Sequence, residues 1–228
     1  SVNNVAQTPY TWTGTLPSTN SLEVTIGNFN FAPFVNHDIQ FTVSRVNNTN
    51  DQRSFNDTLL VQNMHSAMSG TYTIDRNAPA SATNYQSFSA IADNLNNNGI
   101  CGPVGINVVA GSGPYNERFL LNEIRGASNV NTVTLNGNGN TLQFNSSAQA
   151  TMHMVVFNGT KYVKIDNLKI KTLNSSYGFG VLFTNGAAYD SVTNCHIDLS
   201  TITGTSSTNA SAIAFSSSMT SATGSGNN

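Results

Sequence analysis

The carboxylates are the side chains of this sequence best suited to cleaving a polysaccharide, and Asp166 and Asp198 are the nearest approach to a catalytic pair. Hydrolysis of a glycosidic bond needs two carboxyl groups about 5 to 9.5 Å apart. In the repeat described below, Asp166 falls opposite Thr193. Asp190 falls opposite Val163, so no acid faces another acid, and Asp166 and Asp198 are themselves out of register. We expect no catalytic residue and a protein that is not an enzyme.

Other reactive side chains are equally scattered. A polysaccharide lyase needs a calcium-binding cluster of acids beside a Lys or Arg base. Lys164, Lys169 and Lys171 alternate on one expected outward face, but no acid cluster accompanies them. Cys101 and Cys195 lack metal-ligand spacing and lie about three repeats apart, which exceeds the reach of a disulfide. We expect two free, structural thiols.

One segment, NNTNDQRSFNDT, offers oxygen ligands to a hard cation. Asp51 and Asp57, with nearby Asn carbonyls, are candidate calcium ligands, although their spacing does not match an EF-hand loop. The alternative is a turn stabilised by Asx hydrogen bonds, which we favour. We expect no required metal or cofactor, with calcium as the one candidate.

The composition excludes several partners. Charged residues make up 9% of the 228 residues and the formal net charge is −2, against a typical charged content of about a quarter. Such a surface has no basic footprint for nucleic acid. No apolar run approaches the roughly 18 residues of a membrane span, so we expect no membrane insertion. Abundant Asn, Ser and Thr with little Lys and Glu are typical of a secreted protein.

An internal repeat determines the expected fold. Residues 162–170 and 189–197 align without a gap, and this pairs Tyr162 with Tyr189 and Asn167 with Asn194. Short strands repeating every 20 to 30 residues, with no helical pattern between them, are typical of a parallel solenoid. The pair Asn136-Gly137 would be a hairpin turn by local rules, but the repeat favours a corner of the coil. We expect an all-β, right-handed parallel β-helix.

The aligned polar and aromatic side chains allow two interpretations. Asn167 and Asn194 are expected to form a structural ladder at the corners, rather than a row of ligand contacts. Tyr162 and Tyr189 would bind sugar rings if exposed or pack a corner if buried, and we expect packing. Phe157 and Phe183, from adjacent coils, should stack in the core.

Three regions follow from these patterns. Residues 1–68 hold alternating stretches, YTWTGTL, LEVTIGNFNF and HDIQFTVSRV, which predict part of an immunoglobulin-like β-sandwich. Residues 69–103 are a linker and a short amphipathic helix between Ser87 and Gly99, expected to cap the solenoid. Residues 104–228 form the β-helix. We expect both ends of the chain to be truncated.

The motifs resemble a known class of proteins. The run from TYTID through GSGPYNE to IRGASNVNTVTLNGNG resembles the opening of right-handed parallel β-helix regions in very large secreted surface proteins of Bacteroidota, over about residues 70–215. The preceding WTGTLPSTNSLEVTIGNFNF through VNNTNDQRSFNDT looks like the last strands of a CARDB-type immunoglobulin-like module. The resemblance implies an adhesin-like protein exported by the type 9 secretion system, although this sequence lacks the sorting domain of that pattern.

These observations lead to one expected function and two alternatives. We expect a non-catalytic extracellular stalk, attached to the cell surface, for attachment, cohesion or surface movement. Its partners would be extracellular polysaccharide or another cell surface, and the secretion machinery. The alternatives are a polysaccharide-active lyase or hydrolase of the β-helix class and a fragment of a cargo protein bound to the secretion machinery.

Two triplets, Asp57-Thr58-Leu59 and Asp190-Ser191-Val192, resemble the O-glycosylation signal of secreted Bacteroidota proteins. Thr58 and Ser191 are therefore the expected modification sites. A glycan at these hydroxyls would add bulk and solubility to a surface that is short of charge.

Overall fold

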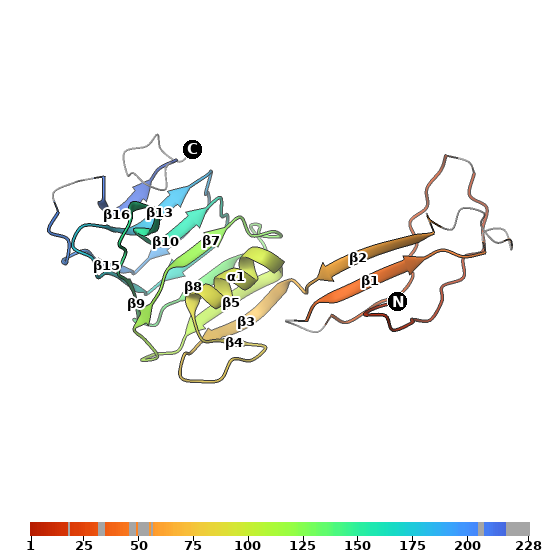
Figure 1. Ribbon diagram of the computed structural model, residues 1–228, viewed down its shortest axis with the longest axis horizontal. Coiled ribbons are helices and arrows are strands. Elements are labelled where there is room, and N and C mark those ends of the chain that lie inside the picture. The colour runs from red at the N-terminus through yellow and green to blue at the C-terminus, as the bar shows by residue number, and fades with distance from the viewer. Residues whose placement is uncertain are drawn as a thin grey trace. The chain divides into compact units, whose positions relative to one another are not determined.

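The computed structural model describes the whole chain except residues 18, 32–34, 46–48, 50–54, 56, 205–207 and 218–228. The protein is all-β and divides into two compact units, Ser1–Ser66 and Ala67–Asn228 (Figure 1). Within the described residues, no helix is both long and apolar enough to cross a bilayer.

The first unit is built on one antiparallel pair of strands, β1 (His37–Thr42) and β2 (Thr58–Met64). The N-terminal residues run against β1, where the amino group of Ser1 donates to the carbonyl of Gln40 over 2.7 Å. His37 is buried, with its ring edge-on to the rings of Phe29 and Phe31.

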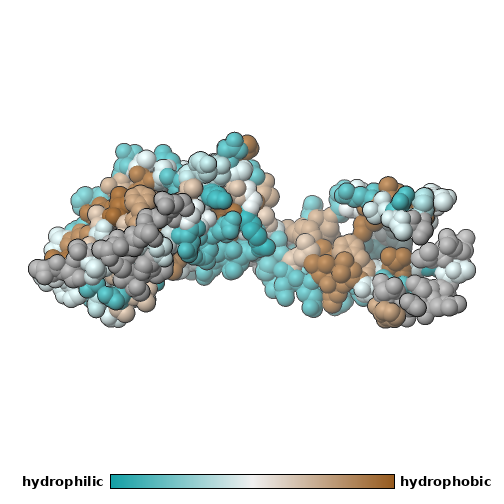
Figure 2. Space-filling model, turned by 90° about the horizontal axis from the view of Figure 1, so that it is seen from above, coloured by the Kyte–Doolittle hydropathy of each residue, from teal (hydrophilic) through white to brown (hydrophobic). Residues whose placement is uncertain are grey.

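Two of the expected strands of this unit do not form. Residues 10–16 and 22–31 contain no strand, although their apolar residues alternate. Alternation says only which side chains share a face, whereas a strand also needs a neighbour for its backbone groups. Many large apolar side chains of the unit are exposed, including Ile26 at 50% and Leu59 at 61%. Figure 2 shows patches of apolar surface on the molecule.

The second unit is a parallel β-solenoid of about five turns, and each complete turn gives one strand to each of three sheets. The first sheet has the order β16 (Ala210–Phe215), β13 (Gly178–Thr184), β10 (His153–Asn158), β7 (Phe119–Asn122). The second has the order β14 (Ser191–Thr193), β11 (Val163–Asp166), β8 (Val133–Asn136), β5 (Ile100–Val108), β3 (Met68–Ile74), β4 (Asn84–Tyr85). The third has the order β15 (His196–Asp198), β12 (Lys169–Thr172), β9 (Thr141–Phe144), β6 (Tyr115–Asn116).

The Asn136-Gly137 bend is a corner of the coil and not a hairpin, as predicted. It separates β8 from β9, which lie in different sheets and pair in parallel with strands of other turns. The nitrogen of Gly137 donates to the carbonyl of Asp166 in the next turn over 2.8 Å. The corner itself therefore belongs to the contact between turns.

The predicted register between turns is confirmed. Ile165 pairs with Val192, and Ile170 pairs with Ile197. The rings of Phe157 and Phe183 stack at a centroid distance of 4.6 Å and an interplanar angle of 6°. Side chains of one kind therefore lie in columns that run from turn to turn.

The helix predicted between Ser87 and Gly99 is α1 (Phe88–Asn98), and the solenoid starts before it. The Ser87 hydroxyl accepts from the nitrogen of Ala90 at the N-terminus, and Gly99 ends the helix with a φ of 68°. The segment 69–103, expected as linker and helix, also contains β3, which pairs in parallel with β5. The sequence of β3 is MSGTYTI, in which apolar residues alternate too little for a strand to be predicted.

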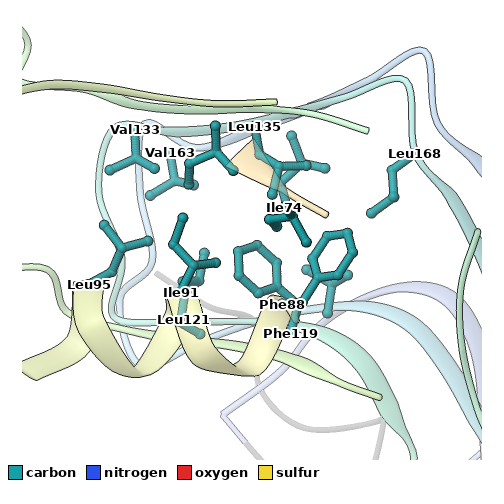
Figure 3. Packing of buried hydrophobic residues seen from close by; sticks show 14 of the residues in the cluster. Ile74, Phe88, Ile91, Leu95, Phe119, Leu121, Val133, Leu135, Val163 and Leu168 are labelled. Atoms are coloured by element: carbon teal, nitrogen blue, oxygen red, sulfur yellow. The ribbon is translucent and has the colours of Figure 1, made fainter. Parts of the chain in front are cut away.

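The core lies between the three sheets and α1. Figure 3 shows Phe88, Ile91 and Leu95 of the helix pointing towards side chains of the sheets. The interior positions are almost wholly aliphatic or aromatic and fully buried, with members including Ile74, Phe119, Leu121, Val133, Leu135, Val163 and Leu168. The hydroxyls of Tyr85 and Tyr115 are polar groups in this cluster, and both are hydrogen-bonded, so packing of apolar side chains is the main interaction between the sheets.

The two glycines of the Asn136 corner provide a test of the contact between turns. A Cβ on Gly137 would lie 2.6 Å from the carbonyl oxygen of Asn167 and 2.7 Å from the Cα of Leu168. Gly139 has a φ of 71°, and a Cβ added there would meet no atom within 4 Å. We expect Gly139→Ala to cost about 1–2 kcal/mol of backbone strain. Gly137→Ala should cost about 3 kcal/mol, at the upper end for overpacking.

Urea unfolding of both variants measures these differences. A Gly137→Ala variant as stable as the parent, or more stable than Gly139→Ala, would contradict the close approach of successive turns at this corner.

Candidate functional site

The two aligned tyrosines pack against each other at the corner, as predicted, but Tyr162 is only partly buried and Tyr189 is exposed. Tyr162 and Tyr189 both have left-handed backbone angles, in the bends that lead into β11 and β14. Their rings stack at 5.0 Å with an interplanar angle of 6°, and Tyr189 is 74% exposed. The bends place both rings outside the apolar interior, where each ring covers a face of the other. A stacked pair offers solvent mainly ring edges, together with the outer face of Tyr189.

The aligned asparagines act at corners. Asn167 and Asn194 have φ values of 53° and 52°, a conformation that asparagine tolerates better than most residues. The side-chain nitrogen of Asn194 donates to the carboxylate of Asp166 over 2.8 Å. The backbone nitrogen of Asn167 donates to the carbonyl of Thr193 over 3.1 Å. Both residues therefore hold adjacent turns together.

A ladder of side-chain amides runs along a different corner, and the sequence analysis missed it. The amide of Asn158 donates to that of Asn122 over 2.8 Å, and the amide of Asn185 donates to that of Asn158 over 2.5 Å. The signal was present in the sequence, because Asn158 and Asn185 each precede a glycine at the same spacing as the tyrosines.

The carboxylates of Asp166 and Asp198 form hydrogen bonds and ion pairs with neighbouring residues of the solenoid. Asp166 accepts from the Thr193 hydroxyl and from Asn194, which lowers its pKa below the usual value. Ser200 donates to Asp198 and Lys171 lies 3.2 Å away, and these contacts lower the pKa of Asp198 to about 2. A general acid at neutral pH needs a raised pKa. Neither group fits that role.

Asp190 has the opposite environment. Burial raises its pKa, although hydrogen bonds from Thr160 and Val163 oppose the shift. One carboxylate oxygen accepts from the Thr160 hydroxyl over 2.7 Å, and the other accepts from the nitrogen of Val163 over 2.8 Å. Both oxygens thus stabilise the bend of the preceding turn.

The three lysines do not share one face, contrary to the prediction. Lys164 lies on β11 and contacts Asp166 at 3.8 Å, whereas Lys169 and Lys171 lie on β12 in another sheet. The turn at Asn167 separates the two strands, and the repeat alone did not show that it changes sheets. The ion pairs Lys164–Asp166 and Lys171–Asp198 lie at the surface, so each contributes little to the free energy of unfolding.

The remaining candidates are the proposed calcium ligands, the modification sites and the cysteines. Asp51 lies outside the described residues, and Asp57 is partly exposed, with its carbonyl accepting from the nitrogen of Val43 over 2.8 Å. Among the described residues, no three His, Cys, Asp or Glu side chains are grouped as metal ligands. Thr58 is exposed at the start of β2, and Ser191 is partly exposed at the start of β14. Both cysteines are free thiols, as predicted.

The candidate site that remains is a groove of about 440 Å³ at the last described turn. We call it the edge groove, and its lining residues are Phe183, Ala187, Ala188, Tyr189, Asp190, Ser191, Val192, Ile213 and Phe215. It is mainly apolar, with the outer face of Tyr189 at one side. The polar side chains of the lining are Tyr189, Asp190 and Ser191, and both Asp190 oxygens accept hydrogen bonds from the preceding turn.

The contacts of Asp198 predict a change of stability in acid. Because folding lowers its pKa from 3.8 to about 2, the stabilisation is present above pH 3.8 and is lost as the pH falls through about 2. We expect Asp198→Asn to destabilise the protein at pH 6 and to lose less further stability than the parent between pH 4 and pH 2.

Urea midpoints across this pH range measure the effect, with Asp93→Asn, an exposed helical position, as the control for loss of one acid. Equal acid sensitivity of the parent and Asp198→Asn would contradict the assignment.

Comparisons with known proteins add no identity to this picture. No protein-family model, no curated protein and no solved structure matches the chain.

Proposed function

We propose that the chain is a non-catalytic, stiff segment of an extracellular cell-surface protein. The observation that carries the proposal is the register between turns, which parallel strand pairing fixes in all three sheets at once. A stalk must transmit force along its axis without changing shape. Columns of paired strands, stacked rings and linked amides provide that resistance along the solenoid.

The surface chemistry supports a structural role over catalysis. The acids of the outer turns, Asp166, Asp190 and Asp198, each accept hydrogen bonds that link or shape the turns. An enzyme would instead leave a carboxylate free to reach its substrate. The polysaccharide lyase or hydrolase remains the competing function only by analogy with other β-helices.

The setting of the protein is part of the proposal. We infer export by a secretion machinery of the type 9 class and display on the cell surface, with polysaccharide or another cell as partner. The support is the resemblance of the GSGPYNE and IRGASNVNTVTLNGNG segments and the weakly charged, Asn- and Thr-rich surface. The first unit would be part of an immunoglobulin-like module. Glycans at Thr58 and Ser191 fit hydroxyls that are at least partly exposed.

We also propose that α1 caps the first turn of the solenoid. The side-chain nitrogen of Asn96 donates to the carbonyl of Leu120 over 3.0 Å, and its oxygen accepts from the nitrogen of Asn122 over 2.8 Å. Asn96 thereby satisfies backbone groups of β7 that would otherwise form an open edge. At the other end of the helix, Glu117 accepts from the nitrogens of Phe88 and Ser89, each over 2.9 Å.

An attachment and cleavage assay tests the proposed function. Particles coated with the protein should attach to polysaccharide-coated surfaces and release no reducing or unsaturated sugar ends. Gly137→Ala particles should attach less, because the surface depends on the aligned turns. Release of sugar ends that Asp190→Asn abolishes would show an enzyme and overturn the proposal.

The cap is tested at Glu117. Glu117→Gln removes the charge that complements the N-terminus of α1 and weakens two backbone hydrogen bonds, so we expect a loss of about 1–2 kcal/mol. The control is Glu123→Gln, which removes one acid at an exposed position. It should change the free energy of unfolding by less than about 0.5 kcal/mol. Hydrogen exchange should become faster in β7 of Glu117→Gln. Unchanged exchange in β7 would argue against the cap.

A further inference from the structure

The sequence contains five Asn-Gly pairs, and all of them lie at corners of the solenoid or at the end of its helix: Asn98-Gly99, Asn136-Gly137, Asn138-Gly139, Asn158-Gly159 and Asn185-Gly186. Such a pair can lose ammonia, because glycine has no Cβ to shield its backbone nitrogen. The glycine nitrogen attacks the side-chain carbonyl carbon of the asparagine and closes a succinimide ring. Its proton leaves with the side-chain amino group as ammonia. Water then opens the ring and gives aspartate or isoaspartate.

The attacking nitrogen of three pairs is held by a bond between turns. Each of these glycines donates its N–H to a backbone carbonyl of the following turn: Gly137 to Asp166 and Gly139 to Asn167, both over 2.8 Å, and Gly159 to Thr184 over 2.9 Å. The N–H must be released from this bond before it can give up its proton. The three reactions therefore require that two adjacent turns separate.

The asparagine side chains of these pairs are also held in place. The side-chain nitrogen of Asn138 donates to the carbonyl of Val108 in the preceding turn over 2.7 Å. That of Asn158 donates to the side-chain oxygen of Asn122 over 2.8 Å. The side-chain oxygen of Asn136 accepts from the nitrogen of Asn138 over 3.0 Å. Each side chain must leave its partner before its carbonyl carbon can meet the glycine nitrogen.

The pair at the end of α1 has a different bond. The nitrogen of Gly99 donates to the carbonyl of Leu95 over 3.0 Å, within the same helix. Its release depends on fraying of the last helical turn and not on separation of solenoid turns. Asn98 is therefore an internal reference for the three corner sites.

We propose that Asn136, Asn138 and Asn158 are deamidation sites that the contact between turns keeps unreactive. Each site reacts only while its turns are apart, so its rate is the rate in an unfolded chain multiplied by the population of the opened state. Water is the one co-reactant that the reaction needs. The proposal rests on the fold and is independent of the proposed function.

The products do not fit the closed solenoid. Aspartate at position 158 would place a carboxylate oxygen where the amide of Asn158 donates to the oxygen of Asn122. Isoaspartate would add one carbon to the main chain at the end of β10, where strands of adjacent turns must stay in register. A separation of turns that is long enough for the reaction would thus leave a permanent change.

Peptide mapping by mass spectrometry, after incubation in mildly alkaline buffer, measures the rate at each site. The reference is a synthetic peptide of residues 131–144, which contains both pairs of the Asn136 corner and lacks the neighbouring turns. We expect Asn136, Asn138 and Asn158 to react at least about tenfold more slowly in the folded chain than in the same chain unfolded in urea. Asn136 and Asn138 should show the same ratio to the peptide. Equal rates in the folded chain and in the peptide would overturn the proposal.

Two matched truncations separate opening of a turn from unfolding of the whole unit. Leu168 is buried beside Gly137 in the following turn, and Leu95 is buried in α1. Leu168→Ala should accelerate Asn136 and Asn138 at least about fivefold and leave Asn98 unchanged. Leu95→Ala should accelerate Asn98 and leave the corner sites unchanged.

Equal acceleration of all sites by either truncation would overturn the proposal, because the reaction would then follow global unfolding. Ile165→Val, a smaller truncation in β11, is measured in parallel in case Leu168→Ala does not fold. It should show the same order, with Asn136 and Asn138 accelerated relative to Asn98. The absence of that order would count against the proposal in the same way.

Discussion

Parallel pairing between successive turns is the constraint on which the rest of the second unit depends. Because side chains alternate between the two faces of a strand, a slip of one residue would turn the column of Ile165 and Val192 outwards. The stack of Phe157 on Phe183 would break at the same time. Each column therefore supports the register of the others, and corners with little room, such as Gly137, add a steric limit.

This constraint also explains how the polar residues of the outer turns are used. A side chain on one turn lies near its counterpart on the next, so hydrogen-bonding groups find partners between turns. Asp166 is held by Thr193 and Asn194, and Asp190 is held by the bend before Val163. A catalytic acid needs an unused oxygen and a pKa near neutrality. Here the same carboxylates are used to align the coil.

Sequence reasoning worked where a repeat could be checked and failed where a neighbour was needed. The alignment of Tyr162 with Tyr189 predicted the parallel solenoid, its corners and the stacked Phe157 and Phe183, because a shared register leaves a matching pattern. It did not predict which side of a corner a ring occupies, so Tyr189 was expected to be buried. Glu117 was missed because its contact with α1 joins residues that are distant in sequence and occurs once.

The first turn of the solenoid differs from the turns that follow it. In a repeat structure each turn gains stability from both neighbours, so an end turn lacks one interface. At the first turn, α1 buries Phe88, Ile91 and Leu95, and Asn96 bonds to the backbone of β7. The backbone groups of a helix bond within the helix, so α1 does not continue the columns of the sheets.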